Sequence, residues 1–429
     1  MTGVIATVFW GVVVLVVLIV VHELGHFIAA RAFGVRVTEF MIGLPGPNVG
    51  VEVKGTKFGI TCIPLGGYNR ITGMEAGPED ENLEDVLAYV YRQGSADIEH
   101  TALACGIDED DAAMALAVLD GWGSINEPGR CNPTENYAAP RTAEFALGQA
   151  REVDDPKALL DAERAQTYRG LGLVKRLVVL FAGPLMNVLL AVAILVALFC
   201  GVGVQAASTT LSDVVAGGPA EAAGMQAGDT VVAIDGQACE GWSEFAALVA
   251  ELSVGDEVTV TYERDGVQHD VALTVGESDE GAAYLGVYAG VETYHCSLLE
   301  GLQMSGAYLV ATVQAYASLV NPSTAAETVS QSTSVVGIAV MAEQAASTSA
   351  VSLFYLIAIV SLSLGIVNLL PVPPLDGGKI VIEVIQRIIG REISASVINA
   401  ITAVAMALLL VLFIVLLAQD IGTFVLGGA

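Results

Sequence analysis

Two histidines and a glutamate, His22, Glu23 and His26, stand in the pentapeptide HELGH at residues 22–26. On a helix, residues four apart share one face, so both histidines can direct an imidazole nitrogen at a single ion. Zinc bonds imidazole nitrogen at about 2.0–2.1 Å, and the adjacent Glu23 can act on a metal-bound water. A chance match in an ordinary buried helix is the alternative. The spacing predicts part of a zinc site that activates water.

A zinc site of this kind needs a third protein ligand and one open position. Asp376, in NLLPVPPLDGG at residues 368–378, is the best candidate. The Pro and Gly residues there can also simply end a helix and turn the chain, and both interpretations can hold together. Asn368 lies eight residues earlier and can offer its amide to a developing oxyanion.

The elements that must position these residues have the composition of membrane helices. Residues 4–21 carry no charge, and the helix can continue through HELGH to about residue 33. The mean hydropathy of the chain is 0.64, and 54% of its residues are hydrophobic. Three further segments, 177–204, 351–371 and 395–418, are long enough to span a bilayer. A cleaved signal peptide fits poorly, because the first basic residue is Arg31.

The basic residues predict the orientation of these four spans. Of 18 Lys and Arg, 14 lie between Arg31 and Arg176, three lie at Lys379, Arg387 and Arg391, and one is Arg264. By the positive-inside rule, residues 31–176 face the cytoplasm and residues 205–350 face outward. HELGH and Asp376 then lie toward the cytoplasmic side. Segment 296–320 carries only Glu300 and resembles a fifth span, but counting it would reverse the later segments. We interpret it as an amphipathic or surface-lying helix.

Two polar blocks separate the spans. Residues 205–290 contain GGPAEAAGMQAGDTVVAIDGQ, a helical stretch and a hairpin, and resemble a PDZ domain, which implies peptide-end binding; a purely structural β domain is the alternative. Residues 75–164 hold 21 acidic and 6 basic residues, and their apolar spacing predicts three short helices in 83–94, 96–106 and 108–125. The acidic start of the third helix argues against nucleic acid as a partner. We expect residues 75–165 to be a cytoplasmic insert that binds a protein partner or has a regulatory role.

A β-hairpin is predicted at residues 48–68, where VEV and FGITCI flank a turn at Lys54 and Gly55. An edge of this hairpin beside the metal can hold an extended substrate as an added strand, whereas an ordinary cytoplasmic hairpin is the alternative.

The six cysteines show no CxxC spacing, and a pair between Cys239 and Cys296 stays open. His100, His269 and His295 lack ligand spacing and are expected at the surface.

Four motifs together resemble a known family: HELGH, PLGGY at 64–68, FAGPLMN at 181–187 and NLLPVPPLDGG. The chain is similar to the site-2 proteases, intramembrane zinc metalloproteases, of the bacterial regulator of sigma-E protease type. The resemblance implies Zn²⁺ held by His22, His26 and Asp376, with Glu23 as general base and acid and Asn368 near the substrate carbonyl. It also implies a membrane-reentrant β-hairpin. It does not cover most of residues 75–165.

The expected fold class is an α-helical membrane protein with about four transmembrane helices, a reentrant β-hairpin, an extracytoplasmic PDZ-like domain and a cytoplasmic helical insert. The predicted parts are a first span with the hairpin (1–74), an acidic insert (75–170), a second span (171–204), a PDZ-like domain (205–290), connecting helices (291–350) and two last spans (351–429).

The expected function is cleavage of membrane-anchored proteins, such as anti-sigma factors or remnant signal peptides, in a multi-pass protein of the plasma membrane. A catalytically silent scaffold that binds peptides is the main alternative. A transporter is weaker, since four spans show no internal repeat.

Overall fold

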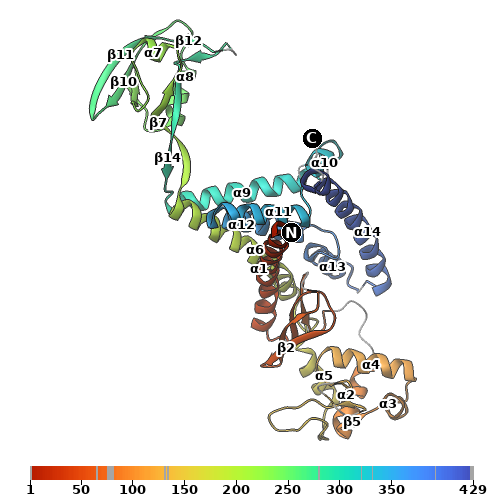
Figure 1. The fold of residues 1–429 in the computed structure, drawn as a ribbon. Coiled ribbons are helices and arrows are strands. Elements are labelled where there is room, and N and C mark those ends of the chain that lie inside the picture. The colour runs from red at the N-terminus through yellow and green to blue at the C-terminus, as the bar shows by residue number, and fades with distance from the viewer. Residues whose placement is uncertain are drawn as a thin grey trace. The chain divides into compact units, whose positions relative to one another are not determined.

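The chain forms two units, Met1–Leu195 with Met304–Ala429, and Val196–Gln303. The computed structural model describes residues 2–63, 66–74, 82–129, 132, 135–278, 281–319, 321–330, 332–391 and 393–425. Pro64 and Leu65 of PLGGY, residues 75–81 and Cys131 lie outside the described residues. Figure 1 shows the order of the elements within each unit.

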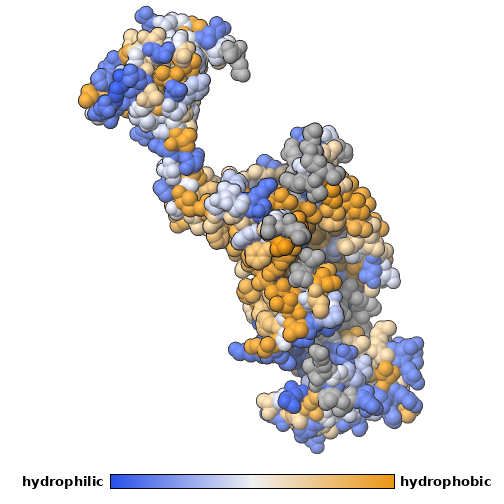
Figure 2. Space-filling view, viewed as in Figure 1, coloured by the Kyte–Doolittle hydropathy of each residue, from blue (hydrophilic) through white to orange (hydrophobic). Residues whose placement is uncertain are grey.

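Four long apolar helices match the predicted spans: α1 (Thr2–Ala32), α6 (Leu173–Ala197, extended by a π-helical turn Leu198–Val202), α12 (Ala350–Asn368) and α14 (Ala395–Asp420). Among the described residues these four helices are long and apolar enough to cross a membrane. They form because a chain in hydrocarbon must satisfy its own backbone hydrogen bonds. Apolar side chains make up most of the helical surface that is visible in Figure 2. Exposed apolar surface of this extent is suited to lipid.

Shorter helices connect the spans. These are α9 (Leu298–Ser318), α10 (Pro322–Ser330), α11 (Val335–Thr348) and α13 (Asp376–Ile389). The ambiguous segment 296–320 is helical as α9, which is not among the candidate spans of the described chain. A core of Val14, Leu18, Ala342, Leu356 and Ile357 joins α1 to α11 and α12.

The predicted hairpin belongs to a four-stranded sheet with the order β2-β3-β1-β4. Its strands are β1 (Val37–Ile42), β2 (Asn48–Val53), β3 (Thr56–Thr61) and β4 (Gly67–Ile71). β2 and β3 are antiparallel around Lys54 and Gly55, whose positive φ angles of 50° and 78° form the tight turn. The sequence prediction missed β1 and β4, because their pairing joins residues far apart in the chain.

In this sheet β4 is the strand that hydrogen-bonds to Glu23 of α1. Asn69 of β4 bonds to Glu23, and a Cβ on Gly67 would lie 3.4 Å from Glu23 Cγ. In the strand order β1 separates β4 from the hairpin, and the hairpin strand β3 also contacts α1, where Phe58 lies 5.6 Å from Phe27 between ring centroids. That a hairpin edge beside the metal holds the substrate stays a prediction.

The acidic insert is a small helical subdomain. The three predicted helices are confirmed as α2 (Leu83–Gln93), α3 (Ile98–Cys105) and α4 (Glu109–Gly121). A further helix, α5 (Pro156–Arg164), was not predicted from the sequence. Asp97, Asp108 and Asp155 cap α3, α4 and α5 through their side chains. Two two-residue strands, β5 (Ser95–Ala96) and β6 (Tyr137–Ala138), pair beside them. Arg36 ties the insert to the sheet through an ion pair of 2.6 Å with Glu163.

The second unit contains a β-sheet ordered β11-β10-β8-β7-β14, with β9 paired to β8. Its elements are β7 (Val204–Val214), α7 (Pro219–Ala222), β8 (Thr230–Ile234), β9 (Gln237–Ala238), α8 (Trp242–Ala250), β10 (Glu257–Arg264), β11 (Val267–Thr274), β12 (Gly276–Glu277), β13 (Ala283–Tyr284) and β14 (Val287–Tyr294). The predicted helix and hairpin are present as α8 and β10–β11. Cys239 and Cys296 are both buried, and no disulfide joins them. His100, His269 and His295 are exposed as expected.

Candidate metal centre

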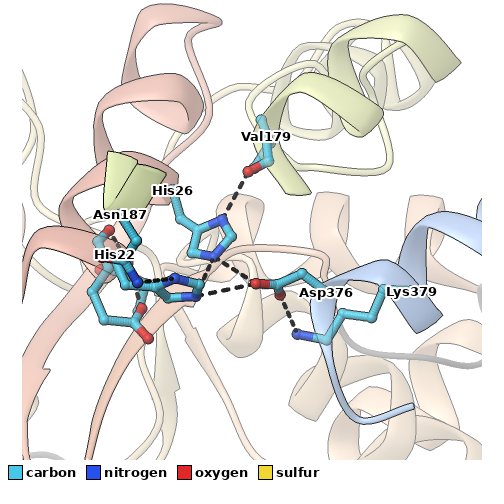
Figure 3. A network of polar contacts seen from close by, with 8 residues as sticks. His22, His26, Val179, Asn187, Asp376 and Lys379 are labelled. Carbon is cyan, nitrogen blue, oxygen red and sulfur yellow. Dashed lines mark hydrogen bonds and ion pairs between the residues drawn. The ribbon is translucent and has the colours of Figure 1, made fainter. Parts of the chain in front are cut away.

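The structure brings His22, His26 and Asp376 together, although 350 residues separate His26 from Asp376. Both histidines project from one face of α1, and Asp376 is the first residue of α13. Figure 3 shows the three side chains converging from the two helices. His26 and Asp376 are 6% exposed, so the site is shielded from bulk water.

The three facing atoms form a nearly equilateral triangle. Nε2 of His22 and Nε2 of His26 are 3.2 Å apart, and Oδ2 of Asp376 lies 3.1 Å and 3.2 Å from them. Tetrahedral ligands at about 2.0–2.1 Å from zinc are separated by about 3.3 Å. Two imidazoles and one carboxylate are also the donor set of an open zinc site, so the residues present fit Zn²⁺.

Helix α6 orients both imidazoles. His26 Nδ1 donates to the carbonyl of Val179 at 2.7 Å, which leaves Nε2 unprotonated toward the centre (Figure 3). The amide of Asn187 lies 3.4 Å from His22 Nδ1, and its buried Oδ1 has no hydrogen-bond partner in the part of the chain that the structure describes. Turning this amide about Cβ–Cγ would let Oδ1 accept the Nδ1 proton of His22 and satisfy both groups. Each histidine thus has a neighbour that can hold its ligating tautomer.

Small residues let α1 and α6 approach closely enough for these contacts. A Cβ on Gly183 would overlap the imidazole of His26, and one on Gly25 would lie 2.7 Å from the carbonyl carbon of Ala182. Glycine at such crossings permits close packing of membrane helices. The FAGPLMN segment therefore provides the space for the site and the amide of Asn187, whereas Val179 lies two residues before it.

Asp376 is held by the turn between α12 and α13. Gly377 and Gly378 pack against the backbone of residues 369–373, with no room for a side chain. Asp376 turns Oδ2 toward the histidines, whereas Oδ1 lies 3.5 Å from Lys379 Nζ (Figure 3). Burial raises the pKa of Asp376, but hydrogen bonds with His22 and His26 outweigh it, so the pKa lies well below its usual range.

Glu23 follows His22 on α1, the helix that carries both histidines. Asn69 of β4 donates through Nδ2 to the backbone carbonyl of Glu23 at 2.6 Å and to Oε2 of Glu23 at 2.8 Å. Sequence reasoning missed Asn69, because nothing in its local pattern signals the contact. It also left Asn187 without a role, although a polar residue inside an apolar span is itself a functional signal.

Asn368 is the last residue of α12 and is half-buried. Within the described part of the chain, no hydrogen bond joins its side chain to His22, His26 or Asp376. Its predicted role at the substrate carbonyl remains a prediction.

The model of peptidase family M50 matches residues 10–412, and the chain therefore belongs to this family, the site-2 zinc metalloproteases. It is a multi-pass membrane protein whose cofactor is Zn²⁺. The family and the assembled triad favour the enzyme over a silent scaffold.

Relatives match over almost their full length. The chain is 29% identical to zinc metalloprotease RasP of Shouchella clausii, over 94% of this chain and 96% of the relative. It is 28% identical to zinc metalloprotease RasP of Oceanobacillus iheyensis, over the same shares. The solved PDZ domain of an SdrC-like protein from Listeria monocytogenes matches 19% of this chain and 86% of its own, at 23% identity and a TM-score of 0.18. That likeness is too low to establish the fold of the second unit.

Proposed function

We propose that this protein is an intramembrane endopeptidase that cleaves membrane-anchored proteins in or near their transmembrane segments. Anti-sigma factors and remnant signal peptides are the expected substrates. The observation that carries the proposal is the triangle of His22, His26 and Asp376, because two of its members lie on an apolar helix long enough to span a bilayer. A hydrolytic site at that position acts on peptide bonds within reach of the membrane.

In this proposal His22, His26 and Asp376 hold Zn²⁺, and Glu23 is the general base and acid. Bound zinc supplies Lewis acidity toward the scissile carbonyl and a water of lowered pKa. Glu23 takes a proton from the attacking water and delivers it to the leaving amine. Asn368 donates from its amide to the developing oxyanion.

A helical substrate must be extended before cleavage, because its peptide bonds are shielded by helical hydrogen bonds. β4 is the last strand of its sheet in the described residues and lies against Glu23. An extended peptide added along this strand would be held by backbone hydrogen bonds. We propose β4, in place of the hairpin, as the strand that presents the substrate.

The hairpin is proposed to re-enter the membrane. Val49, Val51 and Val53 of β2 are 84%, 69% and 50% exposed, and Ile60, opposite Val49, is 56% exposed. Alternating residues of a strand share a face, so these side chains make one apolar surface. Lipid contact would cover it.

Orientation follows from the basic residues. With residues 31–176 and the loop after α12 toward the cytoplasm, the metal site lies on the cytoplasmic side of the plasma membrane, and the second unit lies outside.

We propose that the second unit is PDZ-like and binds a peptide end of the substrate. The acidic insert, residues 75–165, is proposed to bind a cytoplasmic protein; deleting residues 80–160 should then change cleavage or partner binding, and no change would count against this role.

The test compares the full-length chain, purified in detergent, with its Glu23→Gln variant. Zinc content is measured by mass spectrometry, and cleavage is followed on a membrane-anchored reporter. We expect one zinc in both proteins and a rate loss of roughly 10²–10⁴-fold for Glu23→Gln. Glu52→Gln, an exposed position of β2, is the matched control and should cleave normally. Absence of zinc, or equal cleavage by Glu23→Gln, would refute the proposal.

A further inference from the structure

The side chain of Asn69 in β4, outside helix α1, hydrogen-bonds to Glu23 of α1. The amide Nδ2 of Asn69 reaches both the backbone carbonyl and Oε2 of Glu23, at 2.6 Å and 2.8 Å. Because one donor group binds two oxygens of the same residue, it fixes the carboxylate relative to the backbone of α1. Among the described residues no hydrogen bond is formed with the other oxygen, Oε1.

The orientation of the Asn69 amide is determined by these contacts. If its oxygen faced Glu23, three oxygens would meet without a proton between them, so the nitrogen must face Glu23. The amide oxygen Oδ1 then points away, and it is buried with no hydrogen-bond partner among the described residues. Leaving a buried acceptor unsatisfied is unfavourable, and such groups in native structures call for an explanation. The bonds to Glu23 provide one.

The backbone around Asn69 supports the same contact. Asn69 pairs with Phe40 of β1, and Phe40 packs against Phe27 of α1 at 5.7 Å between ring centroids. Gly67, two residues before Asn69, has no room for a Cβ because Ile19 of α1 lies 2.6 Å from that position. The sheet is therefore seated against α1 beside the Asn69 contact, by β4 at Gly67 and by β1 at Phe40.

We propose that Asn69 is a positioning residue for Glu23 in peptide-bond hydrolysis. It acts by holding Oε2 so that Oε1 faces the reacting water, and it binds neither zinc nor substrate. This inference rests on the proposed role of Glu23 as general base. It places part of the catalytic geometry on the strand that we propose to present the substrate.

The test uses the full-length, zinc-loaded protein in detergent and the membrane-anchored reporter. Asn69→Ala removes the donor, Asn69→Asp keeps the shape but turns an oxygen toward Glu23, and Asn69→Gln restores an amide donor. Asn48→Ala, in β2 of the same sheet, is the matched control, because in the described chain its amide donates to the carbonyl of Gly46 and accepts from Lys57, and hydrogen-bonds to neither Glu23 nor the metal ligands. For each variant kcat, KM and zinc content are measured.

We expect Asn69→Ala and Asn69→Asp to lower kcat by roughly 10–100-fold, the range for groups that orient a functional residue, with KM and zinc content unchanged. Asn69→Gln should recover part of kcat, and Asn48→Ala should match the wild type. Wild-type kcat for Asn69→Asp would overturn the role of Asn69 alone. Loss of zinc in Asn69→Ala would also overturn it, since Asn69 would then support the metal site instead of Glu23. Full activity of Glu23→Gln would overturn the proposed general base and this inference together.

Discussion

Gly183 of α6 lies directly against the imidazole of His26, with so little space that a Cβ would overlap Nε2 and lie 2.7 Å from both Cδ2 and Cε1. The metal centre therefore depends on a position that has no side chain. We predict that Gly183→Ala displaces His26 and lowers zinc content to a small fraction of one per protein, with cleavage falling in parallel. Zinc analysis of the purified variant measures this.

Gly306→Ala is the control for that prediction. Gly306 lies in α9, and among the described residues nothing lies within 4 Å of the place that a Cβ would take, so Ala should be tolerated and slightly favour the helix. If Gly183→Ala retains full zinc and activity, the close contact between α6 and His26 does not limit the site.

Asn187 is predicted to tune zinc affinity through His22. Asn187→Leu removes the group beside Nδ1 of His22 and should weaken zinc binding by roughly 10–100-fold. Asn187→Asp keeps an acceptor and should bind zinc more tightly than Asn187→Leu. Competition with a chromogenic chelator gives the affinities.

Ser361→Ala serves as the packing control, because Ser361 donates to the backbone carbonyl of Asn187 at 2.8 Å without touching His22. It should leave zinc affinity near the wild-type value. Equal affinity in Asn187→Leu and wild type would exclude an orienting role for the amide.

The exposed face of β2 is predicted to contact lipid. In vesicles containing brominated lipid, a tryptophan at Val51 should be quenched, whereas one at Glu52 should not, because neighbouring residues of a strand face opposite sides. The native tryptophans give a common background. Equal quenching at both positions would contradict a hairpin with one face in lipid.

The second unit should lose stability in acid through Asp229. Burial raises the pKa of Asp229, but hydrogen bonds from the Arg264 side chain and from the backbone N–H of Gln226 outweigh burial and hold the pKa below its usual value. A carboxyl with a depressed folded pKa stabilises the fold fully above its unfolded pKa of about 3.9. That contribution is lost as pH falls from there through the folded pKa.

Hydrogen exchange of β8 and β10 amides in the full-length protein measures this effect. Asp229→Asn should speed exchange roughly tenfold at neutral pH, where the charged hydrogen bonds are otherwise intact, and reduce the acid dependence. Asp213→Asn, an exposed position of β7, should change neither. An unchanged acid profile in Asp229→Asn would show that another group governs it.

Much of this protein follows from local sequence. The four spans are runs of apolar residues whose backbone can be satisfied in lipid only as helices, and each was predicted to within a few residues of its observed ends. The helices of the insert can be predicted from the sequence in the same way, since apolar spacing and acidic caps act within a few turns. Helical periodicity alone places His22 and His26 on one face.

The remaining features depend on contacts between residues distant in the chain. Asp376 was named as a ligand from its motif, but its 3.1 Å and 3.2 Å distances to the histidines arise from the packing of α13 beside α1. The strand order, in which β1 pairs with both β3 and β4, places Asn69 of β4 beside Glu23. Close packing of α6 brought Val179, Gly183 and Asn187 to the imidazoles. Side-chain periodicity is a property of one segment, whereas strand pairing and helix crossing are decided by the burial of all segments together.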